Sequence, residues 1–348
     1  MSTIQLASFI TVKSFGFQKD GRQVFCFSLK NKNGIELSVS NFGATITSIK
    51  IPISNGKKID IALGFPNVES YEQSYHLPSP PYFGAIVGRY AGRIRNATIN
   101  LNGEKIELNA NWKTHHLHGG NSSFASAFWG VVAVNNNQNP SITFRYKSPD
   151  LEENYPGELL TDVTYTLTEA NEIEVFMRSS SSKDTIVNLT QHTYFNLDGH
   201  DSDLRNQSLI INSNQLLETD EDNLPTGNFT ELTNHPFDFR ETKYLPDSMD
   251  DTFVLNDSTE VPAAILRSEK SGLSLLVFTN QPGLHVYIGG NCFGEIEGKE
   301  NANYHSKSGI CFETEHFQDA PNIPHFPSTF LKKDEIYTHK TTFKIDFI

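Results

Sequence analysis

A strict alternation of apolar and polar side chains recurs along this chain, and it restricts the fold more than any other feature. The pattern is clearest in "SITFRYKS" (141–148), "TDVTYTLTE" (161–169), "EIEVFMRSS" (172–180) and "TTFKIDF" (341–347). Because a period of two places alternate side chains on opposite faces of a β-strand, each of these segments predicts a half-buried strand. We therefore expect a chain built mainly of strands.

Turn signals separate the strand segments. Short clusters rich in Asn, Gly, Ser and Pro, such as "SNGKK", "NLNGEK", "NNNQNP", "SSSSKD" and "NQPG", stand between them. A helical stripe is hard to find, and we expect at most a short helix or two within residues 66–76. With no linker, repeat or change of composition in the sequence, we predict one all-β domain over residues 1–348, an antiparallel β-sandwich or barrel.

The composition describes a globular chain and narrows its partners. Of the 348 residues, 37% are hydrophobic and 20% are charged, and the net charge is −13. A negative surface argues against nucleic acid or an anionic membrane as a partner. No segment resembles a signal peptide or a membrane span, so we expect a soluble cytoplasmic protein. The three cysteines, Cys26, Cys292 and Cys311, form no CxxC pair, and we expect reduced, buried thiols.

The segment "NLTQHTYFNLDG" (188–199) places His192 among an unusual number of hydrogen-bonding side chains. Its apolar residues suggest a strand interior, where polar groups must serve one another or a ligand. A histidine in a strand is commonly a satisfied core residue. The polar neighbours nevertheless favour an imidazole that is held in one orientation for a functional purpose.

Three further histidines stand together in "THHLHGGNSSF". His116 and His118 are expected to share one face of a strand, with His115 on the other. They could form part of a metal site, bind a sugar or acid, or lie in a loop. A metal site needs a third ligand, and the Glu that a cupin-like motif would place after the histidines is absent.

Arginine and aspartate mark two more candidate segments. Arg89 and Arg93 lie in the glycine-rich stretch "FGAIVGRYAGRI", which predicts either a turn or a guanidinium that reaches ligand oxygens between small neighbours. Asp250 and Asp251 precede a strand, a position that is typical of a turn residue.

The last candidate functional segment is "GICFETEHFQDAPN", which contains a pair of carboxylates. Glu313 and Glu315 are expected to share one strand face, opposite Ile310 and Phe312, just before His316. Charged groups are costly in a core strand unless they are paired or used. One held histidine and one strand-borne glutamate could form a general acid and a general base.

In sequence order, these segments resemble the aldose 1-epimerase (galactose mutarotase) family over nearly the whole chain. The resemblance rests on "NFGATITSIKIP", "YFGAIVGRYAGRI", "HLHGG", "YPGELLTDVTYTL", "NLTQHTYFNLDG", "TNQPGLHVYIGGN" and "ICFETEHFQDAPN". It implies a large antiparallel β-sandwich. It also implies an isomerase that interconverts the α and β anomers of hexoses such as galactose and glucose by opening the sugar ring.

The resemblance also implies roles for individual residues. Glu313 would be the catalytic base and His192 the catalytic acid. The residues that it implies for substrate binding are His118 near the ring oxygen and C1, Arg93 and Asp250 at the hydroxyls, and Gln281 and Tyr194 in the pocket wall. The reaction implies an aldose as substrate and requires no metal or other cofactor. The oligomeric state is left as monomer or homodimer.

Three positions depart from the family pattern. Gly92 stands where the family often has Asn, Asp251 where it often has His, and Glu315 where it often has Gln. These departures leave the preferred sugar open. The alternatives to an aldose 1-epimerase are a non-catalytic sugar-binding protein of the same fold, a sugar-phosphate 1-epimerase and, more distantly, a metal-dependent cupin-type enzyme.

Overall fold

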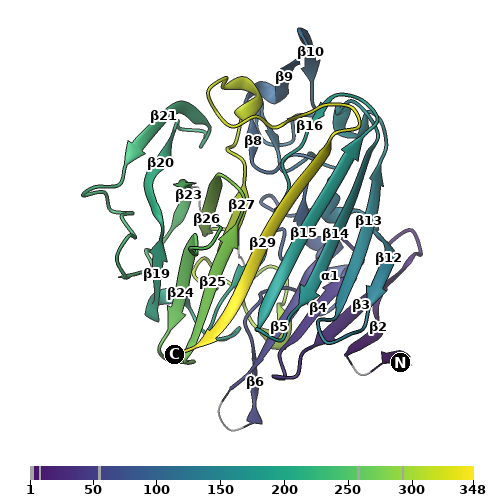
Figure 1. The fold of residues 1–348 in the computed structure, drawn as a ribbon, viewed down its shortest axis with the longest axis vertical. Coiled ribbons are helices and arrows are strands. Elements are labelled where there is room, and N and C mark those ends of the chain that lie inside the picture. Colours follow the sequence, from purple (N-terminus) through teal and green to yellow (C-terminus); the bar gives the residue numbers. More distant parts are fainter. Residues whose placement is uncertain (1–3, 8, 54–55, 257–258, 292–293) are drawn as a thin grey trace.

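The predicted strands pair into three large antiparallel sheets, shown in Figure 1. The computed structural model describes residues 4–7, 9–53, 56–256, 259–291 and 294–348. Cys26 and Cys311 are buried free thiols as expected, and Cys292 lies outside the described residues.

The first sheet is formed by the N-terminal strands in sequence order. Its six strands are β1 (Ile4–Ala7), β2 (Ile10–Phe17), β3 (Gln23–Lys30), β4 (Glu36–Ser40), β5 (Ile46–Pro52) and β6 (Lys58–Asp60).

The second sheet has nine strands and contains the segments with the clearest alternation. Their order across the sheet is β12 (Gly130–Asn135), β13 (Ser141–Ser148), β14 (Leu159–Leu167), β15 (Glu172–Ser181), β29 (Ile336–Phe347), β25 (Leu273–Thr279), β24 (Ala264–Ser268), β19 (Gln207–Ile211) and β22 (Lys243–Tyr244). Along β14 every second residue is fully buried, which confirms the predicted period of two. The final strand, β29, lies in the middle of this sheet (Figure 1).

The third sheet carries much of the site. Its order is β18 (Tyr194–Phe195), β27 (Ile310–Glu315), β26 (Gly283–Ile288), β23 (Met249–Leu255), β20 (Ser213–Thr219) and β21 (Pro225–Glu231).

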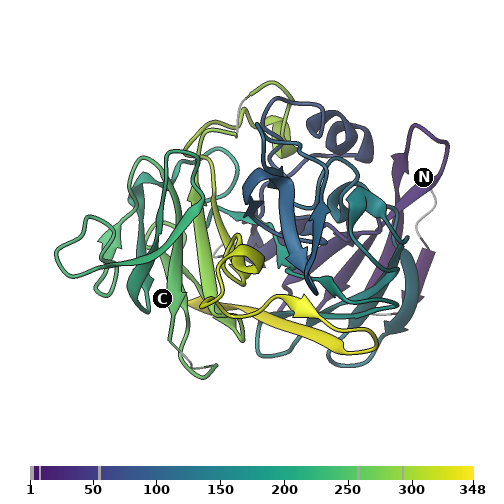
Figure 2. The ribbon, with the colours of Figure 1, turned by 90° about the horizontal axis from the view of Figure 1, so that it is seen from above.

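The two six-stranded sheets pack against the nine-stranded sheet. Phe27 of β3 meets Phe144 of β13 with ring centroids 5.7 Å apart, and Phe195 of β18 meets Phe343 of β29 at 5.0 Å. Buried residues of all three sheets form one continuous hydrophobic cluster. The architecture is thus an all-β sandwich, as the alternation predicts, and its layers are seen from above in Figure 2.

Short strand pairs stand outside the three large sheets, and two of them carry parts of the glycine-rich and histidine motifs. They are β7 (Ile86–Val87) with β17 (Thr190–Gln191), β8 (Arg93–Ile94) with β11 (His116–Leu117), β9 (Thr98–Leu101) with β10 (Glu104–Glu107), and β16 (Thr185–Ile186) with β28 (Phe330–Leu331). Pairing of β7 with β17 and of β8 with β11 brings residues 86–94, 116–118 and 190–192 together.

The expected short helix is present as α1 (Val68–Ser74). The side chain of Asn67 caps it by accepting a hydrogen bond from the amide of Ser70 at 2.9 Å. Among the described residues, no helix is long and apolar enough to span a membrane.

Candidate active site

A cavity of about 420 Å³ opens where the short paired segments meet the third sheet. This volume is within the range of small-molecule sites. Six of the seven residues predicted to form the site line it, and they come from separate parts of the chain: Arg93, His118, His192, Tyr194, Asp250 and Glu313.

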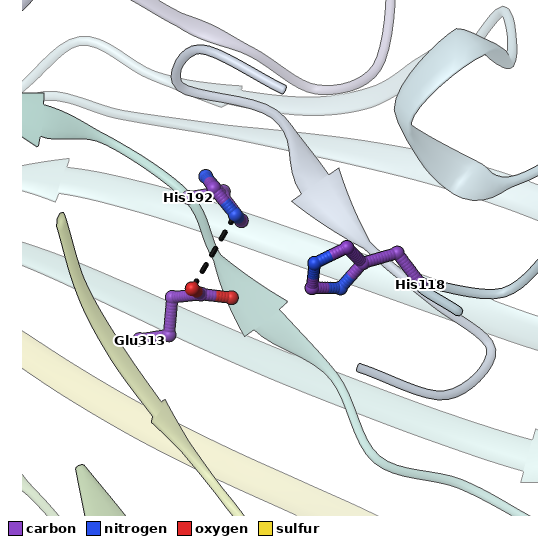
Figure 3. Close-up of side chains that lie close together, drawn as sticks. All are labelled: His118, His192 and Glu313. Carbon is purple, nitrogen blue, oxygen red and sulfur yellow. Dashed lines mark ion pairs between the residues drawn. The ribbon is translucent and has the colours of Figure 1, made fainter. Parts of the chain in front are cut away.

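His192 and Glu313 face each other in this cavity (Figure 3). The Nε2 atom of His192 lies 3.4 Å from Oε1 of Glu313, and both side chains are almost fully buried. Glu313 is fixed on β27 by pairing with His285 of β26. The backbone of His192 is fixed by hydrogen bonds to Gly84 and Ala85, just before β7. Strand β27 and the short connection between β17 and β18 therefore place a potential base and a potential acid within ion-pairing distance of each other.

The surroundings of His192 favour its neutral form. Burial lowers its pKa, and the charge of Glu313 offsets this only in part. The rings of Tyr82 and Tyr194 stand 5.8 and 5.4 Å from its ring. The imidazole thus packs against two aromatic rings.

His118 enters the cavity from a strained turn. Its φ of 50° reverses the chain after β11, and its ring stands nearly perpendicular to that of His192 at 5.4 Å. Burial lowers the pKa of His118 well below its usual value, with His192 and Arg93 adding to the effect. The amide of Gly92 donates to Nδ1 at 3.2 Å, so the neutral ring carries its hydrogen on Nε2. His118 is thereby set as a hydrogen-bond donor.

The expectation that His116 and His118 share one strand face is wrong, because β11 ends at Leu117 and the chain then turns. His116 points into the core, where its Nε2 meets the hydroxyl of Tyr155 at 2.6 Å. His115 lies beside Asp222, with 3.3 Å between Nε2 and the carboxylate. Of the three histidines, His118 is the one that lines the cavity.

A charged network forms another wall of the cavity. Asp250 lies 3.5 Å from Nη2 of Arg93 and 3.0 Å from Nε2 of His285, and Asn223 donates to it at 2.8 Å. Burial opposes ionisation of Asp250, but these partners outweigh it and lower its pKa to about 2. Burial likewise opposes the charge on His285, yet Asp250 raises its pKa to about 9. The wall thus holds an arginine, an imidazolium and a carboxylate at neutral pH.

Arg89 does not reach the cavity. It is 1% exposed, and its guanidinium donates to the carbonyls of Ser148, Pro149, Pro156 and Gly157 and to the hydroxyl of Ser148. Arg89 therefore has a structural role, whereas Arg93, only 12% exposed, lines the cavity, where its guanidinium could reach a ligand.

Gln281 is also placed away from the cavity lining. Its Oε1 atom contacts Nδ1 of His316 at 2.9 Å, and its Nε2 donates to Asn280. The same segment instead presents His285 to the cavity, four residues later. The sequence contained a signal for His285, since an imidazole between the buried Leu284 and Val286 is as unusual as His192 in its own strand.

A neighbouring side chain fills the space beside Gly92, where the family often has Asn. Gly92 has a φ of +76°, and a Cβ built on it would lie 2.4 Å from Cγ of Gln318. The Oε1 atom of Gln318 accepts from the amide of Arg93 at 3.0 Å, and its Nε2 lies 3.4 Å from His285. Gln318 therefore occupies the space that a side chain at position 92 would need.

Glu315 lines the same cavity wall but is fully buried. Neither carboxyl oxygen has a hydrogen-bond partner among the described residues. Burial raises the pKa of Glu315 well above its usual value, and the nearby Glu313 adds to the rise against the opposing charges of His285 and Arg93. The neutral form of Glu315 is thus favoured beside Glu313. Asp250 and Asp251, expected just before a strand, lie within β23, and burial also raises the pKa of Asp251.

Three side chains of the cavity have the composition of a metal site. Donor atoms of His118, His192 and Glu313 all lie within 4.8 Å of one another. However, Nδ1 of His118 already accepts the Gly92 amide, which leaves hydrogen on Nε2. A metal ion would have to displace that bond. The donor set is therefore better suited to hydrogen bonding than to holding a metal.

Solved structures of carbohydrate epimerases share this fold. A galactose 1-epimerase from Lactobacillus acidophilus superimposes with a TM-score of 0.83 at 27% identity, over 98% of this chain and 99% of that one. An aldose epimerase homologue from C. elegans gives 0.84 at 28% identity, over 92% and 98%. The molecule therefore has the fold of the galactose mutarotase class of β-sandwich proteins.

Sequence comparison defines the family. The aldose 1-epimerase family model matches residues 26–344. Galactose mutarotase from Bos taurus is 37% identical over 320 residues, covering 89% of this chain and 91% of that protein. Aldose 1-epimerase from Escherichia coli (strain K12) is 31% identical over 342 residues, covering 93% and 96%. The chain belongs to the aldose 1-epimerase family. It is an isomerase that interconverts the anomers of an aldose.

Proposed function

We propose that this protein interconverts the α and β anomers of hexopyranoses such as galactose and glucose, with Glu313 as base and His192 as acid. The observation that carries the proposal is the placement of these two side chains from different elements at 3.4 Å in one cavity. Support for the substrate class comes from the relatives named galactose mutarotase.

The reaction needs only these two groups. The Glu313 carboxylate takes the proton of the C1 hydroxyl while Nε2 of His192 gives a proton to the ring oxygen O5. The C1–O5 bond breaks and C1 becomes an aldehyde. After rotation about C1–C2, the O5 hydroxyl attacks the other face of C1, and the two protons return. Each group contributes about 10²–10⁴-fold.

The remaining cavity residues have binding roles in this proposal. His118 donates from Nε2 near the ring oxygen and C1. Arg93 and Asp250, the latter paired with His285, bind sugar hydroxyls, and the Tyr194 ring borders the sugar next to His192. Gln281 is not part of the proposed site, because its side chain is engaged with His316.

A sugar phosphate is a poorer candidate, because a phosphate needs cationic groups that are free to bind it. The guanidinium of Arg89 is buried among carbonyls, Arg93 is paired with Asp250, and Arg95 is paired with Asp220. The arginines that cluster in the sequence are therefore already engaged in the fold.

The direct test is polarimetry. Freshly dissolved α-D-glucose and α-D-galactose should approach equilibrium faster with the wild-type protein than without it, and binding alone would leave the rate unchanged. A non-catalytic sugar-binding protein would give that second result.

Catalysis without a cofactor has its own test. Dialysis against EDTA should leave the rate unchanged, because the proposed acid and base are both side chains. Activity that is lost on dialysis and restored by a divalent ion would contradict the proposal. We also propose a cytoplasmic protein of one domain that does not bind nucleic acid, consistent with its net charge of −13 and its continuous core.

A further inference from the structure

The two ring nitrogens of His192 face different groups. Nε2 points at the carboxylate of Glu313, 3.4 Å away, and Nδ1 lies 3.5 Å from Sγ of Cys311. Cys311 is fully buried on β27, two residues before Glu313 and thus on the same strand face. One strand therefore contacts both nitrogens of the imidazole.

These contacts bear on the choice between the two neutral tautomers of the ring, in competition with the backbone carbonyl of His192 itself, an acceptor that also supports a ring N–H. A neutral imidazole carries one hydrogen, and its other nitrogen is an acceptor. An ionised carboxylate can only accept, so Glu313 favours the tautomer with hydrogen on Nε2. That tautomer leaves a lone pair on Nδ1, and a thiol is a weak donor that can satisfy it. The burial that lowers the pKa of His192 keeps the ring in this neutral, tautomeric state.

We propose that Cys311 is a positioning residue that donates its S–H to Nδ1 of His192 and so holds the imidazole hydrogen on Nε2, the nitrogen that faces the sugar. The proposal rests on the proposed role of His192 as the acid. A neutral imidazole with hydrogen on the catalytic nitrogen can act as an electrophile toward an oxygen, as it does in another isomerase. With hydrogen on Nδ1 instead, Nε2 would present a lone pair to O5 and could donate nothing.

The tautomer is read directly by ¹⁵N NMR of histidine-labelled protein without sugar, since a nitrogen that bears hydrogen and one that bears a lone pair have well-separated chemical shifts. The chain has 12 histidines, so the signals of His192 are those missing from His192→Gln. The wild type should show hydrogen on Nε2. Hydrogen on Nδ1, with sulfur as the acceptor, would overturn the proposal.

Variants test whether the thiol is the cause. Cys311→Ala should move His192 toward a mixture of tautomers and lower kcat by about fivefold to tenfold with little change in KM. Cys311→Ser, which keeps a donor, should retain the tautomer and most of kcat. An unchanged tautomer in Cys311→Ala, or an equal loss of kcat in the Ser variant, would contradict the proposal.

Cys26 provides a matched control. It is also a buried thiol, it contacts the hydroxyl of Thr47 at 3.4 Å, and it does not line the cavity. Cys26→Ala removes a similar buried volume and should leave both the tautomer and kcat unchanged.

If Cys311→Ala does not fold, Cys311→Val preserves the volume without the donor and is expected to give the same two changes. A normal kcat in His192→Gln would contradict the proposed role of His192 as the acid. It would not change the tautomer that NMR reports for His192 in the presence or absence of the Cys311 thiol.

Discussion

Glu313 and Glu315 stand two residues apart on one face of β27, yet their surroundings differ. Glu315 is fully buried without a hydrogen-bond partner among the described residues, which favours its neutral form, whereas Glu313 lies beside His192. Glu313→Gln preserves the shape of the site and removes the base. We expect kcat to fall by about 10²-fold or more while KM changes little, as measured by polarimetry over a range of sugar concentrations.

The matched control is Glu315→Gln. Because an amide has nearly the shape of a neutral carboxylic acid, this variant should keep most of the wild-type kcat. A near-normal kcat in Glu313→Gln together with a large loss in Glu315→Gln would identify Glu315 as the base.

His192 and His118 lie in one cavity but should respond differently to replacement. His192→Gln removes the proposed acid, so it should lower kcat strongly and remove one limb of the pH profile of kcat. His118→Asn loses a donor that contacts the sugar, so it should raise KM as well as lower kcat. If His118→Asn instead removes the limb and His192→Gln retains it, the two roles are reversed.

At the scale of the elements, the buried guanidinium of Arg89 ties the loop after β7 to the segment that joins β13 to β14. Five hydrogen bonds converge on it, four of them to backbone carbonyls. Lysine has three donors in a different geometry and would leave some of these carbonyls unpaired. Arg89→Lys should therefore lower the free energy of unfolding by about 3 kcal/mol, measured by urea denaturation.

Arg145 is a suitable control for this substitution. It makes a two-pronged contact with Asp162, but on an exposed surface. Arg145→Lys should cost less than about 1 kcal/mol. An Arg89→Lys protein with normal stability and a raised KM would mean that Arg89 contacts the sugar after all.

Some of the elements could be predicted from the sequence, and others could not. Alternation identifies strands such as β14 because one face of each is buried, and the sequence also indicated a short helix within residues 66–76, where α1 lies. Alternation could not predict that His118 leaves the strand face of His116, because that depends on a positive φ at a residue other than glycine or asparagine. It also could not separate Arg89 from Arg93, whose neighbours in space come from distant loops.

Across the whole molecule, the neutral state of Glu315 makes stability depend on pH. The pKa of Glu315 is raised above 4.5 in the folded protein, so above about pH 4.5 the unfolded chain releases a proton that the folded chain retains. The free energy of unfolding therefore falls as the pH rises, until the pH reaches the pKa of Glu315 in the folded protein.

Glu315→Gln removes this dependence. The melting temperature of this variant minus that of the wild type, both measured by calorimetry, should increase as the pH is raised from 4.5 to 8. The exposed Glu260 supplies a control, since Glu260→Gln should show a constant difference across the same range. A constant difference for Glu315→Gln as well would mean that Glu315 is ionised in the folded protein.

Local sequence patterns could predict only part of the candidate site. The motifs indicated which residue types were available, and six of the seven predicted residues line one cavity. The filling of the space beside Gly92 by Gln318 arises from a contact between residues 226 positions apart, and the engagement of Gln281 with His316 and of His285 with Asp250 joins different segments of the chain. No window of sequence contains both sides of such a contact.

The central position of β29 has a consequence for how the chain reaches this structure. The strand pairs with β15 on one side and β25 on the other, so within the nine-stranded sheet residues 130–181 and 207–279 are joined only through it. Each half can form hairpins between neighbours, but the sheet closes only after a partner more than 150 positions from β15 arrives. Because such distant closures are slow, refolding should be limited by the docking of β29, and partly folded chains should expose two unpaired sheet edges until it occurs.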